Sequence, residues 1–333
     1  MIPLLAHSSA GEPSATEPDR TLALELVRAT EAAALSSHHW VGRGQKDAAD
    51  GAAVTAMRAF LTSVRMDGHI VIGEGEKDGA PMLFNGEAVG NRLGPSCDIA
   101  VDPIDGTSLV AAGRAGALSV IAAAGRHAMY DPSAVFYMNK WVTSGAAAGV
   151  IDPREPVAGN LSAVARALGT SVSALTVAVL DRPRHAALVQ QIRSVGAGVR
   201  LLDDGDVAAG VVAAMPGSAI DVCVGIGGTP EGVITACAVK ALGGELLGTL
   251  APQSDLERDR ALRAGHDLQR VFTHDDLAGE GPTIFVATGI TTGILVDGVE
   301  QVGGRTRTHS LILRSHTETM RWVTADHAPS PSS

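Results

Sequence analysis

Helical and extended segments alternate four times between residues 156 and 250, and this alternation limits the possible folds more than any other feature of the chain. Each helical segment carries apolar residues at helical spacing, and a short apolar strand follows it. Such alternation predicts a mostly parallel sheet covered by helices. The expected helix and strand pairs are 160–168 with 174–180, 184–195 with 198–202, 206–214 with 219–224, and 230–242 with 244–248.

The N-terminal part has a different pattern, which predicts helices packed on a mostly antiparallel sheet. Leu22, Leu26, Ala29 and Ala33 repeat at helical spacing, as expected for a helix over residues 19–37. The other expected elements are a helix at 47–65, strands at 70–72, 99–101, 117–123 and 135–138, a strand at 284–287, and a candidate hairpin at 293–300 and 308–314.

We therefore interpret the fold class as α/β, with two unlike parts. Residues 19–155 form the α+β part with a mostly antiparallel sheet, and residues 156–325 form the α/β part with a mostly parallel sheet. Residues 1–18 and 326–333 are rich in Ser and Pro and are expected to be disordered.

The charge balance narrows the classes of function. The chain carries 26 Lys and Arg residues against 36 Asp and Glu residues, a formal net charge of −10, which argues against binding to nucleic acid or anionic membranes. Cys97, Cys223 and Cys237 are an odd set without close spacing, as expected for buried thiols in a reducing compartment. No apolar run has the length of a transmembrane helix and no secretion signal is recognisable, so we expect a cytoplasmic protein.

Asp102 and Asp105 are the strongest candidates for a chemical site. They lie three residues apart after the apolar run 99–101, and Gly106 and Thr107 follow directly. Carboxylates are preferred ligands of hard cations such as Mg²⁺ and Mn²⁺, glycine permits close approach of a ligand, and the hydroxyl can orient a water molecule. We predict a metal-assisted phosphate site; the alternative is that both aspartates only form a turn and cap the next helix.

Two further acidic positions precede this motif. Asp50 lies one turn before Ala53 on the apolar face of the second helix, where an unpaired carboxylate is costly, so it is a candidate metal ligand. Glu74 and Glu76 flank Gly75 after strand 70–72. They indicate either a metal ligand at a tight turn or a solvated acidic turn.

The glycine-rich run 225–232 lies between strand 219–224 and helix 230–242. A glycine loop at the start of a helix can bind phosphate through its backbone amides, and Glu231 either binds a metal or only interacts with the helix dipole. The run is not a P-loop, because no Gly-Lys-Ser/Thr follows. It is also a poor dinucleotide fingerprint, because Pro230 occupies the place of the third glycine.

Two more polar motifs follow neighbouring strands. Arg182 and Arg184 come after strand 174–180, and Asp204 and Asp206 come after strand 198–202. Forked arginine donors suit a phosphate, and the aspartates suit sugar hydroxyls. The alternatives are a solvated basic turn and, for Asp206, a helix cap. These two motifs and the glycine-rich run belong to one edge of the expected sheet, which is where such sheets bind ligands.

Taken in order, the motifs resemble the class II fructose-1,6-bisphosphatases, within the wider group of metal-dependent sugar and inositol phosphatases. The resemblance covers the chain from about residue 20 to residue 315. It implies a layered αβαβα architecture, with a metal and phosphatase domain over residues 19–155 and a substrate-binding domain over 156–325. The matching segments are 40–44, Lys46, 49–54, 72–76, 80–83, 98–107, 183–185, 204–206, 225–232 and 287–291.

The resemblance also implies a ligand set for at least two divalent cations, Mg²⁺ or Mn²⁺. Asp50 and Glu74 match ligands of one metal. Asp102, Asp105 and Glu231 match ligands of a second metal.

By the same resemblance, Asp78 and Thr107 match the acid and hydroxyl pair that activates water, and Lys46 matches a lysine of the catalytic site whose role is not fixed. The family often has Lys at the position of Arg182, which keeps the charge but not the forked donor geometry. The positions that match substrate contacts are Asp105, Gly106, Thr107, Tyr137, Arg182, Pro183, Arg184, Asp204, Gly205, Asp206 and Gly228.

The implied activity is metal-dependent hydrolysis of the 1-phosphate of D-fructose 1,6-bisphosphate, a gluconeogenic step, by a homodimer or homotetramer. Sedoheptulose 1,7-bisphosphate is the near alternative substrate, alone or as a second one, whereas inositol monophosphate would leave the two arginines without a phosphate. A nucleotide-binding oxidoreductase or module that uses the run 225–232 is the alternative of a different class. The missing third glycine counts against it, as does the weak candidate for an acidic ribose ligand, Glu245.

Overall fold

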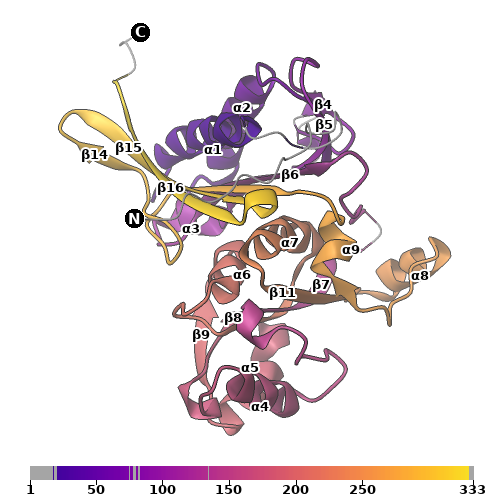
Figure 1. Cartoon of the computed structure of the whole chain (residues 1–333). Helices are drawn as coiled ribbons and strands as arrows, with labels where there is room; N and C mark the ends of the chain where they lie inside the picture. The colour runs from indigo at the N-terminus through magenta and orange to yellow at the C-terminus, as the bar shows by residue number, and fades with distance from the viewer. Residues whose placement is uncertain are drawn as a thin grey trace, which may run out of the picture.

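The computed structural model describes residue 18 and residues 21–74, 76–77, 80–81, 83–133 and 135–329. Three helical layers and two sheets alternate through the molecule (Figure 1), which confirms the α/β class and the αβαβα layering. The helices are α1 (Leu22–His38) and α2 (Lys46–Leu61) in the first layer, α6 (Val207–Ala214) and α7 (Thr229–Leu242) between the sheets, and α4 (Val157–Ala167) and α5 (Ala186–Ser194) in the last layer.

The first layer follows the predicted apolar periodicity. The four residues that predict α1 are all buried against the first sheet. In α2, Ala53, Met57 and Leu61 form the buried face and Asp50 extends it by one turn. The helix ends at Leu61, four residues before the predicted end, because the chain turns there and brings Val64 into the core.

Within the described residues the first sheet has eight strands, and β1 and β5 are its one pair of parallel neighbours. The other neighbours are antiparallel, as predicted for the N-terminal part. The strand order is β14 (Glu300–Val302), β15 (Arg305–Arg314), β13 (Ile284–Gly289), β6 (Leu118–Gly125), β5 (Ser96–Asp105), β1 (Asp67–Ile72) and β4 (Ala88–Val89), with β16 (Thr319–His327) paired to β15.

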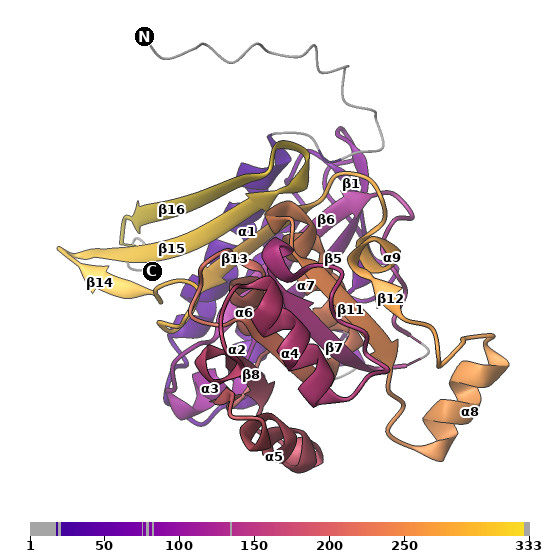
Figure 2. The same cartoon turned by 60° about the horizontal axis from the view of Figure 1, so that its bottom comes forward.

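The last strand, β16, has no counterpart in the sequence prediction. Its side chains include the exposed Met320 and Trp322 and many polar residues, so the segment lacks the apolar pattern used to recognise strands. β16 reaches His327, so Asp326 and His327 lie in the sheet rather than beyond it. The ribbon of β14, β15 and β16 projects on the side of the molecule opposite to α8 (Asp255–Arg263), as both views show (Figure 1 and Figure 2).

The second sheet is mixed, whereas the alternation predicts a mostly parallel one. Only β10, β8 and β9 are parallel neighbours. β7 comes from the N-terminal part, lies between β10 and β11, and is antiparallel to both. The strand order is β12 (Phe272–Thr273), β11 (Glu245–Leu250), β7 (Tyr137–Thr143), β10 (Val222–Gly228), β8 (Thr176–Leu180) and β9 (Gly198–Leu202).

Each sheet therefore combines segments from before and after residue 155. β7 joins the second sheet, and β13 to β16 join the first. The division of the chain into domains at residue 155 stays a prediction.

The layer between the sheets consists of small residues. Every residue of α6 is buried, and the helix contains only Ala, Val and Gly. A Cβ atom at Gly210 would lie 2.7 Å from the Cγ2 atom of Thr235, so the glycine permits the close approach of α6 to α7. This close packing brings the two sheets near enough to share one cleft.

The remaining elements are short connections. Cys97, Cys223 and Cys237 are buried, as predicted. Among the described residues, the helices are too short or too polar to span a lipid bilayer. The short elements are α3 (Thr107–Ala112), α9 (His274–Ala278), β2 (Glu76–Lys77) and β3 (Ala80–Pro81).

Candidate active site

A cleft of about 550 Å³ is lined by residues from both sheets and from the helices that follow their strands. It collects most of the residues that the sequence singles out, although they are spread over more than 180 positions of the chain. The predicted site residues that line it are Lys46, Glu74, Asp102, Asp105, Gly106, Thr107, Tyr137, Arg182, Arg184, Asp204, Gly205, Asp206, Gly228 and Glu231.

Two predicted site residues are not among those that line the cleft, and a third lies outside the described residues. Asp50 is buried in α2, where its charge acts on Asp102. Pro183 begins a short 3-10 turn between the two arginines. Asp78 lies outside the described residues.

Asp102 and Asp105 share one face of β5 because the strand is irregular between them. In a regular strand, a spacing of three places side chains on opposite faces. Against β6, however, Asp102 pairs with Val120 and Asp105 pairs with Leu118, so β5 has one extra residue here. Val120 and Leu118 both belong to the core between the sheets. The bulge therefore directs both carboxylates toward the second sheet.

The carboxylates of the cleft are in an unfavourable environment for their charge. Burial raises the pKa of Asp102 well above its usual value, and the charges of Asp105, Glu74, Glu231 and Asp50 raise it further. Burial is also the main reason why the pKa of Asp105 and that of Glu231 are raised. A cation bound between these groups would relieve the repulsion.

The residues present fit a divalent cation by their chemistry, although no cluster is assembled. Within the described part of the chain, no group of three acidic, histidine or cysteine side chains is arranged to hold a metal ion. Asp102 Oδ1 accepts a hydrogen bond from the Ile104 N–H at 3.0 Å instead. The Oε2 atom of Glu231 is buried and has no hydrogen-bond partner among the described residues. A buried carboxylate oxygen without a donor is the kind of ligand that a hard cation completes.

Asp204 connects the two sides of the cleft. Its Oδ1 lies 2.8 Å from Arg182 Nη2, and its Oδ2 accepts hydrogen bonds from the hydroxyl and the N–H of Ser108. Ser108 follows Thr107 in α3, so the contact ties the start of this helix to the arginine. The sequence analysis missed Ser108, because a serine after Thr107 gives no signal of a partner 96 residues away.

Arg184 and His185 fix the end of β10. Arg184 donates to the Ile226 carbonyl from Nε at 3.2 Å and from Nη2 at 2.8 Å, and its guanidinium lies 5.2 Å from the ring centroid of Tyr137. His185 Nδ1 donates to the Leu180 carbonyl at 2.7 Å, and its Nε2 accepts from the Ile226 N–H at 2.8 Å. Burial lowers the pKa of His185, which fits this neutral tautomer.

The glycine run is part of a strand, so the loop predicted for residues 225–232 is wrong. β10 pairs with β7 through Gly228, and α7 begins at the next residue. Glycine is required at these positions because neighbouring side chains leave no space for a Cβ atom. A Cβ atom at Gly227 would collide with the carboxylate of Asp206, and one at Gly228 would collide with that of Glu231. The strand backbone thus supports two acidic side chains of the cleft.

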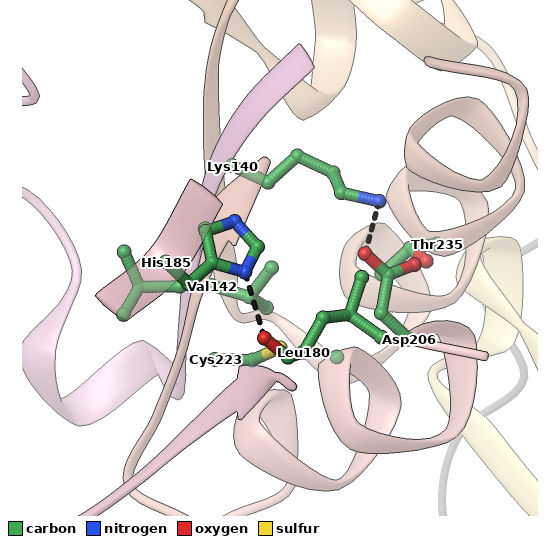
Figure 3. A pocket seen from close by; sticks show the side chains of 10 residues that line it. Lys140, Val142, Leu180, His185, Asp206, Cys223 and Thr235 are labelled. Carbon is green, nitrogen blue, oxygen red and sulfur yellow. Dashed lines mark hydrogen bonds and ion pairs between the residues drawn. The ribbon is translucent and has the colours of Figure 1, made fainter. Parts of the chain in front are cut away.

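Lys140 lies beneath the cleft and was also missed. Its Nζ is 2.6 Å from Asp206 Oδ2 and donates to the Gly228 carbonyl at 3.2 Å. Figure 3 shows the lysine reaching across to Asp206. Asp206 occupies the N-cap position of α6, but its side chain pairs with Lys140 and makes no capping hydrogen bond. The sequence carried one signal for a buried lysine, the alternation of side chains along a strand. Lys140 shares a face of β7 with the buried Met138 and Val142.

Comparison with known proteins now identifies the family. The family model for bacterial fructose-1,6-bisphosphatase, glpX-encoded, matches residues 20–327. The chain belongs to this family. It is 42% identical to the class 2 fructose-1,6-bisphosphatase of Haemophilus influenzae over an alignment of 322 residues. The alignment covers 93% of this chain and 96% of the relative. It is 43% identical to fructose-1,6-bisphosphatase 1 class 2 of Escherichia coli K12 over an alignment of 321 residues. This alignment covers 92% of this chain and 95% of that relative. The resemblance inferred from the motifs is confirmed.

Proposed function

We propose that the protein hydrolyses the 1-phosphate of D-fructose 1,6-bisphosphate to fructose 6-phosphate and phosphate, a step of gluconeogenesis. The observation that carries the proposal is the division of charge in the cleft, with the buried carboxylates of Asp102, Asp105 and Glu231 at one end and two arginines at the other. A sugar with two phosphates matches both ends, one through metal ions and one through guanidinium groups. The names of the two relatives support the same substrate.

The metal ions proposed here are Mg²⁺ or Mn²⁺. Asp50 and Glu74 would hold one, and Asp102, Asp105 and Glu231 would hold the other. The all-oxygen donor set and the buried Glu231 oxygen without a partner support this assignment. Such ions, when bound, polarise the phosphate and lower the pKa of a bound water.

The side chains around the reacting phosphate orient the water and balance charge. Thr107 lies at the start of α3 and lines the cleft. Its hydroxyl makes a long contact of 3.4 Å to the Ile104 carbonyl, and we propose that it orients the attacking water. Asp78 is proposed as the base that polarises this hydroxyl. Lys46, at the start of α2, is proposed to bring a positive charge to the scissile phosphate.

The opposite end is proposed to bind the second phosphate and the sugar. Arg182 and Arg184 are already engaged by Asp204 and by the Ile226 carbonyl, but each guanidinium has five N–H donors, so donors remain for a phosphate. Pro183 fixes the turn between them. The other proposed contacts are Gly106, Tyr137, Asp204, Gly205, Asp206 and Gly228, whose backbone or polar atoms surround the space for the sugar.

The test is phosphate release from fructose 1,6-bisphosphate with Mg²⁺ or Mn²⁺ and with EDTA. Parallel assays use sedoheptulose 1,7-bisphosphate and inositol monophosphate. We expect release from the first substrate that EDTA abolishes. Equal release in EDTA would contradict the metal assignment, and faster turnover of inositol monophosphate would contradict the role of the arginines.

Some statements stay predictions. These are the choice between Mg²⁺ and Mn²⁺, activity toward sedoheptulose 1,7-bisphosphate, assembly as a homodimer or homotetramer, and a cytoplasmic location without nucleic-acid or membrane partners.

A further inference from the structure

The acidic side chains of the cleft differ in whether the protein supplies them with a counter-ion. Asp102, Asp105 and Glu231 form no ion pair within the described part of the chain. Asp206 does, because Lys140 Nζ lies 2.6 Å from its Oδ2. These three acids are among those proposed as metal ligands, whereas Asp206 is proposed to contact the substrate.

The ammonium of Lys140 is held on several sides. It pairs with Asp206, donates to the Gly228 carbonyl at 3.2 Å, and its Cδ lies 3.2 Å from where a Cβ of Gly232 would stand, so the stem packs on α7. The side chains of Lys140 and Asp206 are only 7% and 10% exposed. The cavity beside them holds about 10 Å³, room for about one water.

Asp206 is close enough to the metal end to act there if it were released. Among neighbouring charges, Asp206 has the largest effect on Asp105, and Glu231 is the next. Lys140 acts electrostatically on Glu231 as well as on Asp206. One fixed positive charge therefore neighbours both the paired acid and the proposed metal ligands.

We propose that Lys140 is a positioning residue that serves as the built-in cation of the site. It keeps Asp206 out of the metal cluster and holds Asp206 and Gly228 at the substrate end of the cleft. This inference rests on the proposed function for the roles of the two ends.

The proposal predicts opposite effects on metal and substrate. Without the lysine charge, the cleft repels a divalent cation less and Asp206 becomes available to it, so metal binding becomes tighter. At the same time, Asp206 and Gly228 lose their fixed positions, so the substrate binds more weakly. A lysine that only stabilised the fold would weaken both or change neither.

The experiment uses Lys140→Met in the full chain. Free Mn²⁺ is measured by electron paramagnetic resonance while metal-depleted protein is titrated without substrate, and KM and kcat for fructose 1,6-bisphosphate are measured at saturating Mn²⁺. We expect Mn²⁺ affinity to rise about tenfold, KM to rise about tenfold, and kcat to stay within about threefold. The double variant K140M/D206N removes both charges, so its Mn²⁺ affinity should return to that of the unchanged protein.

The chain offers a matched control in Lys240. Its Nζ lies 2.5 Å from Asp275 and donates to the Gly279 carbonyl at 2.6 Å, which repeats the chemistry of Lys140 away from the cleft. Lys240→Met should leave Mn²⁺ affinity and KM unchanged. If Lys140→Met does not fold, Lys140→Gln, which keeps a donor toward Asp206, replaces it.

Unchanged or weaker Mn²⁺ binding in a folded Lys140 variant would overturn the inference, and so would an unchanged KM in Lys140→Met. The Mn²⁺ titration needs no substrate. Failure of the unchanged protein to release phosphate from fructose 1,6-bisphosphate would therefore count against the proposed function and leave the metal test of Lys140 decisive.

Discussion

The two ends of the cleft differ in whether the protein supplies cations to balance the buried carboxylates. At the carboxylate end, defined by Asp102, Asp105 and Glu231, burial is the main reason why the pKa of each group is raised, and neighbouring acidic side chains raise it further. At the paired end, defined by the ion pairs Arg182–Asp204 and Lys140–Asp206, the protein supplies its own cations. This difference indicates that the carboxylate end needs cations from solution to balance its charge. The paired end is instead preorganised for a ligand that carries its own negative charge.

The largest effect should come from the carboxylate end. Asp102→Asn removes one proposed metal ligand, and we expect phosphate release to fall by at least about 10³-fold, because bound metal contributes several kcal/mol to such reactions. Asp203→Asn is the control, since Asp203 is exposed and pairs only with Arg114 through its side chain. Near-normal turnover in Asp102→Asn, with folding confirmed by circular dichroism, would remove Asp102 from the proposed metal site.

A change at the paired end should affect substrate binding instead. Arg184→Ala removes forked donors proposed for the second phosphate, and we expect KM for fructose 1,6-bisphosphate to rise about 10- to 100-fold, as charged hydrogen bonds contribute about 1.5–3 kcal/mol. The Mg²⁺ concentration for half-maximal rate should not change. Arg200→Ala, an exposed arginine on β9, is the control. A shift in the metal requirement of Arg184→Ala would show that the two ends are not separate.

Acidification should affect the metal-free and metal-loaded protein differently. Because the folded pKa of Asp102, Asp105 and Glu231 is raised, their contribution to stability is complete below the ordinary carboxyl pKa and is lost as the pH rises through the raised pKa. Metal binding requires the ionised groups and so opposes this trend. Thermal unfolding with Mg²⁺ and with EDTA, from about pH 8 to about pH 5, should show the stabilisation by metal shrinking as the pH falls. A constant difference in Tm would contradict the account.

The smallest effect concerns the contact between the two ends. Gly205 has φ +66°, and a Cβ there would lie 2.9 Å from both carboxylate oxygens of Asp105. Gly205→Ala should lower kcat/KM about tenfold because the Asp105 carboxylate must move, and should destabilise the fold by about 1–2 kcal/mol through backbone strain. Gly169 has the same φ with nothing within 4 Å of its Cβ position. Gly169→Ala should therefore reproduce the loss of stability, seen as a lower Tm, without the loss of activity.

The sequence predicted the elements well where periodicity was strong. Strand 198–202 is found with its predicted bounds, and the helix and strand alternation of residues 156–250 is present throughout. It could not predict the position of β7 in the second sheet, because strand neighbours depend on long-range packing. It missed β16 because partly exposed strands in a projecting ribbon need no apolar pattern.

For the site, the acidic residues and the arginines could be predicted from the sequence, but their arrangement could not. The bulge between Asp102 and Asp105 has no signature in local composition, yet it decides that the two side chains share a face. Glycines 225, 227 and 228 were interpreted as a ligand-binding loop, although they are present because acidic side chains and a histidine pack against their strand. Lys140 was overlooked because its partner Asp206 is distant in sequence.

The most direct test is a crystal structure of the unchanged protein grown with Mn²⁺, with the ions located by anomalous scattering. The account predicts Mn²⁺ peaks at the carboxylate end, in contact with Asp102, Asp105 and Glu231 and on the side of Asp50 and Glu74, with Lys140 still paired to Asp206. Peaks held by Asp204 or Asp206, or no peak within the cleft, would contradict it.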